Sequence, residues 1–181
     1  MGAQLYLELG SFSMNKDLSK YFTYEDLTRT DYKEFQKKNQ ETGIKYLPAL
    51  ESLGDMLDGI IDGIGVKVRL CSAYRCEELN FAVGSSKRSQ HLRGEAADFC
   101  SIGGDTLETR DKLFEQVLYY LIQNGIMFGQ IIKESAQRSY GTTYWIHISL
   151  GAPFRPLFNC GQVLEATDGK YKMIKKIPIN S

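Results

Sequence analysis

The two histidines of this chain each lie in a short segment whose residue types are able to bind a metal. His91 is followed within the same segment by Asp98, and His147 lies in the segment 144–149. A catalytic zinc site takes three protein ligands, drawn from His and carboxylate side chains, and leaves a fourth position for water. His91, Asp98 and His147 would supply such a set. The alternative is that both are ordinary histidines, one on a loop and one in a strand.

Gly94 lies between His91 and Asp98 and disfavours a continuous helix there. A turn at Gly94 would instead send the chain back as a strand, so that the returning Asp98 could meet His91. We therefore expect these two side chains to lie together.

The segment around His147 reads as a strand, in which side chains alternate between the two faces. His147 would share one face with Trp145 and Ser149, while Ile146 and Ile148 would face the core. A polar face that carries a histidine above a buried face suits a site built on a rigid sheet.

Hydrophobic periodicity predicts the elements that position these residues. Helical spacing runs from Leu50 to Ile64 with Pro48 in the first turn, and a second long helix is predicted over residues 107–123. Thr23 and Asp26 indicate a capped helix start. A short helix is predicted over residues 77–83, and strands over residues 66–70, 96–99, 130–133, 144–150, 163–165 and 171–174.

These elements come in a definite order along the chain. Asp168-Gly169 is a hairpin signal between the last two strands, and Gly141 falls in a polar loop between the two strands before them. Helices dominate the first part and strands the last, which predicts an α+β domain.

Composition narrows the class of protein. The chain has 181 residues, 43% of them hydrophobic, which suits one domain with a packed core. Its 22 basic and 22 acidic residues balance, so it lacks the basic footprint of a nucleic-acid-binding protein. The sequence contains no apolar stretch of about 18 residues, so no transmembrane helix is predicted. The acidic Glu8 lies where a signal peptide would have its apolar core, so we expect that the chain has no signal peptide and is synthesised in a cytoplasm.

Met14 begins a segment typical of a native start. We expect residues 1–16 to be an N-terminal extension, from an alternative start or from added vector sequence, and residues 17–181 to form a single domain. The four cysteines (Cys71, Cys76, Cys100 and Cys160) show no metal-binding spacing. We expect them to be reduced and partly buried, although a bridge between Cys71 and Cys76 stays open.

Several segments together resemble a known family. They are Ser72-Ala73-Tyr74-Arg75, Leu79-Asn80-x-Ala82-Val83-Gly84-x-Ser86, Ser89-x-His91-x-x-Gly94-x-Ala96-x-Asp98 and Trp145-Ile146-His147-Ile148-Ser149. In these segments the chain is similar to the zinc D-Ala-D-Ala carboxypeptidases and related peptidoglycan peptidases of metallopeptidase family fifteen, subfamily A, of the LAS clan, and to their phage-type branch. The resemblance covers roughly residues 17–150. It implies a small antiparallel sheet that carries the zinc site and is flanked by helices, as in the hedgehog/D-Ala-D-Ala peptidase-like fold.

The resemblance also assigns roles to individual residues. It makes His91, Asp98 and His147 the zinc ligands, and it makes Arg75 the group that binds a substrate carboxylate or the developing oxyanion, as its planar fork suits. Ser89 would bind substrate or orient His91. A surface salt bridge is the alternative for Arg75. Trp145 would line the substrate cleft, with plain packing as the alternative.

At the position of the general base, this sequence departs from the pattern of the better-known members of the family. Thr142, Thr143 and Tyr144 occupy the places where some relatives carry a Glu or a His before the last ligand. Glu134 is the first candidate, because it ends a strand that resembles the Gln-x-Ile-x-Glu element of the phage-type branch and should pair with the His147 strand. A solvent-exposed Glu134 is the alternative, and Glu95 is the second candidate.

The resemblance implies a zinc peptidase that cuts the stem peptides of bacterial cell wall, of phage or prophage origin and monomeric. Carboxypeptidase and endopeptidase activity both stay open. It would act on the wall after phage-mediated release or as a virion component. The rival hypothesis is a non-catalytic module that keeps the fold and the zinc and binds cell wall or a virion partner.

Overall fold

The structure is a computed structural model that describes residues 13 and 15–178. Most of the predicted extension over residues 1–16, and the predicted native start at Met14, lie outside the described residues. The α+β class predicted from the sequence is confirmed: helices flank one six-stranded sheet with the order β1-β2-β4-β3-β5-β6. The strands are β1 (Val68–Ser72), β2 (Ala96–Ser101), β3 (Phe128–Arg138), β4 (Gly141–Leu150), β5 (Gln162–Thr167) and β6 (Lys170–Lys176).

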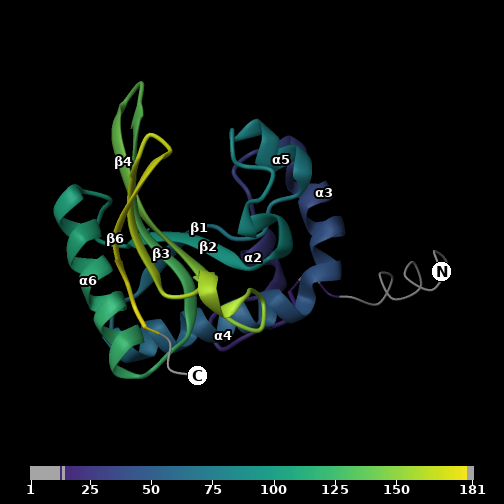
Figure 1. Cartoon of the computed structure of the whole chain (residues 1–181). Helices are drawn as coiled ribbons and strands as arrows, with labels where there is room; N and C mark the ends of the chain where they lie inside the picture. Colours follow the sequence, from purple (N-terminus) through teal and green to yellow (C-terminus); the bar gives the residue numbers. More distant parts are fainter. Residues whose placement is uncertain (1–12, 14, 179–181) are drawn as a thin grey trace.

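The helices are α2 (Tyr24–Thr28), α3 (Lys33–Gly43), α4 (Leu47–Ile64), α5 (Glu77–Ala82) and α6 (Leu107–Gln123), with 3₁₀ turns η1 (Ile44–Tyr46), η2 (Gln90–Arg93) and η3 (Leu157–Asn159). Helices α4 and α6 contact each other and pack against the sheet. Figure 1 shows the β3–β4 hairpin and α5 rising on either side of strands β1 and β2. Among the described residues, no helix is long and apolar enough to cross a membrane.

The long helices form where the apolar spacing predicts them. On α4 the side chains of Leu50, Leu53, Leu57 and Ile60 are at most 1% exposed, and Pro48 sits in its first turn. The capping box between Thr23 and Asp26 is present at the start of α2. Helix α3 was not predicted from the sequence, so its presence corrects the predicted set of helices.

The sheet is antiparallel at every pairing except one. Strand β3 pairs antiparallel with β4 but parallel with β5. Strand β4 ends beside the start of β3, and the connection over residues 151–161 crosses to the other side of β3, where β5 begins at the same level. The expected loop around Gly141 is a tight turn, and Gly141 itself begins β4. Asp168 and Gly169 both have positive φ, 49° and 72°, as the predicted hairpin turn between β5 and β6 requires.

The four cysteines are free, as expected. Cys76, Cys100 and Cys160 are buried and Cys71 is exposed. A bridge between Cys71 and Cys76 is not formed. The sulfur of Cys71 lies instead 3.6 Å from that of Cys100 on the neighbouring strand β2.

Candidate metal centre

The turn that joins His91 to Asp98 is built around Gly94. Ser89 caps η2 by accepting a hydrogen bond from the backbone N–H of His91, 3.3 Å away. Gly94 ends η2 with a φ of 66°, a left-handed conformation that glycine adopts without strain. The chain then returns as β2, which carries Asp98. The turn predicted at Gly94 is thus present and brings the two side chains together.

His147 reaches the same point from a different strand. In the antiparallel register, His147 on β4 is the direct partner of Asp98 on β2. Ile146 and Ile148 on the opposite face are fully buried in the core, as the alternation along this strand predicts. The cleft on the other face is lined by Trp145 and His147.

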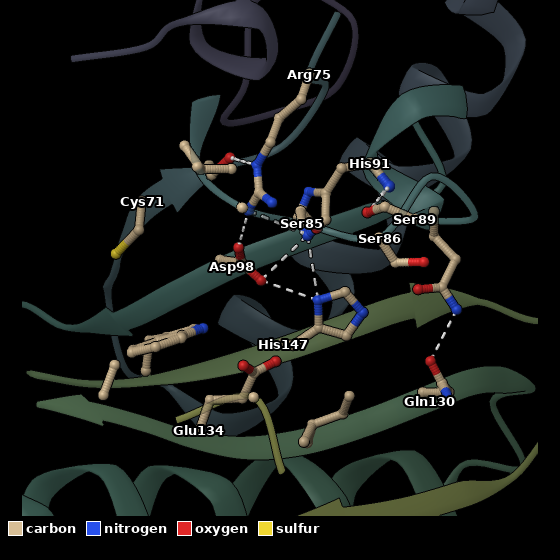
Figure 2. Close-up of a pocket in the computed structure, with 18 of the residues that line it drawn as sticks. Cys71, Arg75, Ser85, Ser86, Ser89, His91, Asp98, Gln130, Glu134 and His147 are labelled. Carbon is tan, nitrogen blue, oxygen red and sulfur yellow. Dashed lines mark hydrogen bonds and ion pairs between the residues drawn. The ribbon is translucent and has the colours of Figure 1, made fainter. Parts of the chain in front are cut away.

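The three side chains place one ligand atom each at the corners of a small triangle. His91 Nε2 lies 3.2 Å from His147 Nδ1 and 3.3 Å from Asp98 Oδ1, and His147 Nδ1 lies 2.9 Å from Asp98 Oδ1. Ligand atoms about 2.0–2.1 Å from a tetrahedral zinc lie about 3.3 Å apart. The donor set and its spacing therefore fit zinc. All three residues are buried, and Figure 2 shows them converging.

Contacts of the His91 ring prepare one of its nitrogens to bind a metal. Nδ1 lies 2.6 Å from the backbone carbonyl of Ala73 and can only donate to it, which leaves the lone pair on Nε2. Burial, reinforced by the Arg75 charge, lowers the pKa of His91 to about 4. The imidazole is therefore neutral at pH 7, the form that binds a metal.

Arg75 lies beside the triangle and is itself held in place. Its Nε donates to the Ser72 hydroxyl at 2.8 Å, and its Nη2 donates to Asp98 Oδ2 in a close ion pair. Burial opposes ionisation of Asp98, but the interactions of its carboxylate with His91 and Arg75 outweigh it and hold the Asp98 pKa well below its usual range. The carboxylate that faces the two histidines is thus ionised, as a metal ligand must be.

Glu134 is half-buried and lies on the cleft face of β3, opposite Trp145. Figure 2 shows its side chain beside His147, with no bond to the other residues drawn. Burial, together with the nearby charge of Asp98, raises the pKa of Glu134 to about 7. Arg110 holds the Glu134 backbone by donating to its carbonyl at 3.1 Å. A carboxyl group with a pKa near neutrality next to a metal triangle is suited to proton transfer.

Glu95, the second candidate for the base, does not face the metal-binding triangle. Its buried carboxylate receives two hydrogen bonds from Arg93, at 2.7 and 2.8 Å, and it does not line the cleft. Of the two candidates for the base, only Glu134 faces the same cleft as the triangle.

The cleft also contains residues that sequence reasoning missed. Gln90, Gln130, Gln162 and Arg155 line it together, although they come from η2, β3, β5 and the connection between β4 and β5. Two of these residues had a signal in the sequence: Gln90 directly precedes His91, and Gln130 begins the Gln-x-Ile-x-Glu element that ends at Glu134.

The sequence model of the peptidase M15 family matches residues 20–126, more than half of the chain. The chain belongs to the peptidase M15 family. The resemblance found in the sequence is thus confirmed at the level of the family. Peptidases of this family are typically zinc-dependent. No curated protein matches the chain.

The M15 match includes Arg75, His91 and Asp98 but ends before Glu134 and His147. What links these last two residues to the site is geometry: the Asp98–His147 register and the position of Glu134 on the next strand. The family assignment and the geometry therefore contribute separate parts of the same site.

Proposed function

We propose that this chain is a zinc-dependent peptidase that hydrolyses peptidoglycan stem peptides, as a D-Ala-D-Ala carboxypeptidase or as an endopeptidase. The observation that carries the proposal is the convergence of three potential ligand atoms, 2.9–3.3 Å apart, in a cleft that is also lined by the half-buried carboxyl group of Glu134. Membership of the M15 family supports peptide hydrolysis as the reaction.

His91, Asp98 and His147 would hold the zinc. Zinc bound there supplies Lewis acidity, which activates water as a nucleophile near pH 7 and polarises the scissile carbonyl. Glu134 would take the proton from the attacking water and pass it to the leaving amine, a task that its pKa of about 7 suits. Arg75 would stabilise the negative charge that develops on the carbonyl oxygen.

The size of the cleft supports a substrate of several residues. Its volume is about 2000 Å³, above the roughly 300–1,000 Å³ of pockets that enclose a small ligand. Ser89 and Trp145 line this cleft with Glu134, so they would contact the bound peptide.

We further propose that residues 17–181 form one catalytic domain of phage or prophage origin that acts as a monomer. It would reach the cell wall after phage-mediated release or as a virion component. The six strands belong to one sheet, which supports a single domain.

The test is digestion of defined substrates by the zinc-loaded full chain. Stem pentapeptides and muropeptides from several wall chemotypes would be incubated with it, and the products identified by mass spectrometry. Release of D-Ala would indicate a carboxypeptidase, and a cut within the stem an endopeptidase. If the zinc-loaded protein binds wall material but cleaves none of these substrates, the binding module replaces the peptidase.

A further inference from the structure

Arg155 lies in the connection between β4 and β5 and lines the cleft. Its Nη1 is 3.5 Å from the carbonyl of Asn159. Both terminal nitrogens face the Gln90 amide, and with the amide oxygen turned toward them Nη1 is 3.2 Å from that oxygen. Because a guanidinium can only donate, this orientation is the one that satisfies both groups.

That orientation extends along a row of three amides. The Gln90 and Gln130 side chains meet at 2.8 Å, and those of Gln130 and Gln162 at 2.7 Å. Once Gln90 turns its oxygen to Arg155, Gln130 must donate to that oxygen and accept from Gln162 in turn. Arg155 is thus the head of a hydrogen-bonded row that fixes its position at the cleft wall.

No carboxylate in the part of the chain that the structure describes forms an ion pair with Arg155, and its buried Nε has no hydrogen-bond partner there. Glu95 acts on Arg155 only at longer range, and its carboxylate is bonded to Arg93. Burial lowers the pKa of Arg155. Arg75, Arg93 and Arg110, by contrast, each pair with a carboxylate.

Partial burial of an unpaired charge is unfavourable, and a carboxylate ligand would relieve it through a charge-assisted hydrogen bond. Arg75 is less available for this task, because its guanidinium already binds Asp98.

The position of the glutamine row relates Arg155 to the metal triangle. Every second residue of β3 from Gln130 to Glu134 lines the cleft, and the middle one, Ile132, is the direct partner of His147. Gln130, which belongs to the row, and Glu134 therefore lie on opposite sides of His147. Each is about 7 Å along β3 from Ile132. Figure 2 shows Gln130 and Glu134 on opposite sides of His147.

We propose that Arg155, oriented by Gln90, Gln130 and Gln162, binds a carboxylate of the substrate peptide on the side of the metal centre opposite Glu134. The inference rests on the proposed function and adds a specificity determinant to it. In a stem peptide this carboxylate is either the C-terminal one or the α-carboxylate of the D-Glu residue.

Three versions of one peptide distinguish these sources: L-Ala-γ-D-Glu-L-Lys-D-Ala-D-Ala as the free acid, as its C-terminal amide and as its D-Glu α-amide. We expect the wild type to lose about 10- to 100-fold in kcat/KM on one of the two amides, the size of a lost hydrogen bond to a charged group. Arg155→Gln should lose a similar factor on the free acid, through KM, and nothing further on that amide.

Arg138→Gln is the matched control, because Arg138 also lines the cleft but lies exposed at the far end of β3. It should treat the three peptides as the wild type does. Amidation changes the peptide and leaves the protein as it is, so the loss of rate that the wild type shows on an amide cannot come from a folding defect. Equal wild-type rates on all three peptides would overturn the inference while leaving the peptidase intact.

If the wild type cleaves none of the three, the proposed function fails and titration calorimetry with the same peptides decides the inference. Binding that is weakened alike by one amidation and by Arg155→Gln would support the carboxylate site. Binding indifferent to both changes, or no binding of the free acid, would overturn it.

Discussion

Two carboxyl groups of the cleft have pKa values that their surroundings shift in opposite directions. Burial opposes the ionisation of both, but at Asp98 the interactions with His91 and Arg75 prevail and hold the pKa well below its usual range. At Glu134 burial prevails and raises the pKa to about 7. Such a separation assigns the groups different tasks: Asp98 suits a permanent ligand and Glu134 a group that gains and loses a proton.

Glu134→Gln tests this assignment. The amide keeps the size of the side chain but cannot accept a proton, so we expect kcat on stem peptides to fall by about 10²- to 10⁴-fold. Zinc content by elemental analysis should stay at the wild-type level. Glu95→Gln is the control and should retain activity, since Glu95 bonds Arg93 and does not itself line the cleft. Equal rates for Glu134→Gln and the wild type would place the base elsewhere.

Arg75→Lys tests the role of the guanidinium. Arg75 bonds Ser72 through Nε and Asp98 through Nη2, and a lysine ammonium cannot reproduce this fork. We expect kcat/KM to drop by at least about 10-fold, the equivalent of one hydrogen bond to a charged group, with bound zinc unchanged. Wild-type kinetics in this variant would mean that Arg75 contributes only its charge or only structure.

At the scale of elements, the sequence predicts best where apolar side chains recur at a helical or alternating period. Helix α4 and strand β4 are such cases, with Leu50, Leu53, Ile146 and Ile148 fully buried. The period of their apolar residues reflects which side chains are buried, so both the type of element and its position can be predicted from it. Strand β1 begins two residues later than predicted, at Val68 rather than Val66, because terminal residues of a strand carry little of that pattern.

Helix α3 could not be predicted in this way. Its only buried residues are Asn39 and Gly43, so it has no apolar stripe. The Asn39 side chain instead donates to the carbonyls of Thr28 and Tyr74 and accepts from the Cys76 N–H. A polar side chain that ties α3 to the end of α2 and to residues 74–76 fixes the helix, and such contacts leave no periodic signal in the sequence.

Gly94 is the element-scale feature on which the site depends most. A Cβ there would lie 3.0 Å from two atoms of Leu50, in addition to the strain of its positive φ. Gly125 has a similar φ of 62° but open space around it, so it is a matched control. We expect Gly125→Ala to lower the free energy of unfolding by about 1–2 kcal/mol and Gly94→Ala by about 2–4 kcal/mol.

Urea denaturation of both glycine variants measures this difference. Gly94→Ala should also weaken zinc binding, since the turn brings His91 to Asp98, whereas Gly125→Ala should not. Identical destabilisation with normal zinc affinity in both would show that the turn tolerates a side chain and does not set the ligand geometry.

At the scale of the molecule, the candidate site joins segments that lie far apart in the chain. The three candidate ligands could be predicted because His91 and Asp98 share one motif and because His147 is the only other histidine. Arg155 and the glutamine row could not, since their residues meet only when β3 pairs with β5 in parallel. A single Gln or Arg in the sequence carries no sign of such a partner.

The central claim is that one metal, held by His91, Asp98 and His147, is needed for peptide hydrolysis. The most direct measurement is the rate of cleavage of a stem pentapeptide as zinc is added stepwise to the chelator-treated full chain. The account predicts a linear rise to a plateau at about one zinc per chain, and no rise in His147→Ala. Full activity without added zinc, or an unchanged plateau in His147→Ala, would contradict it.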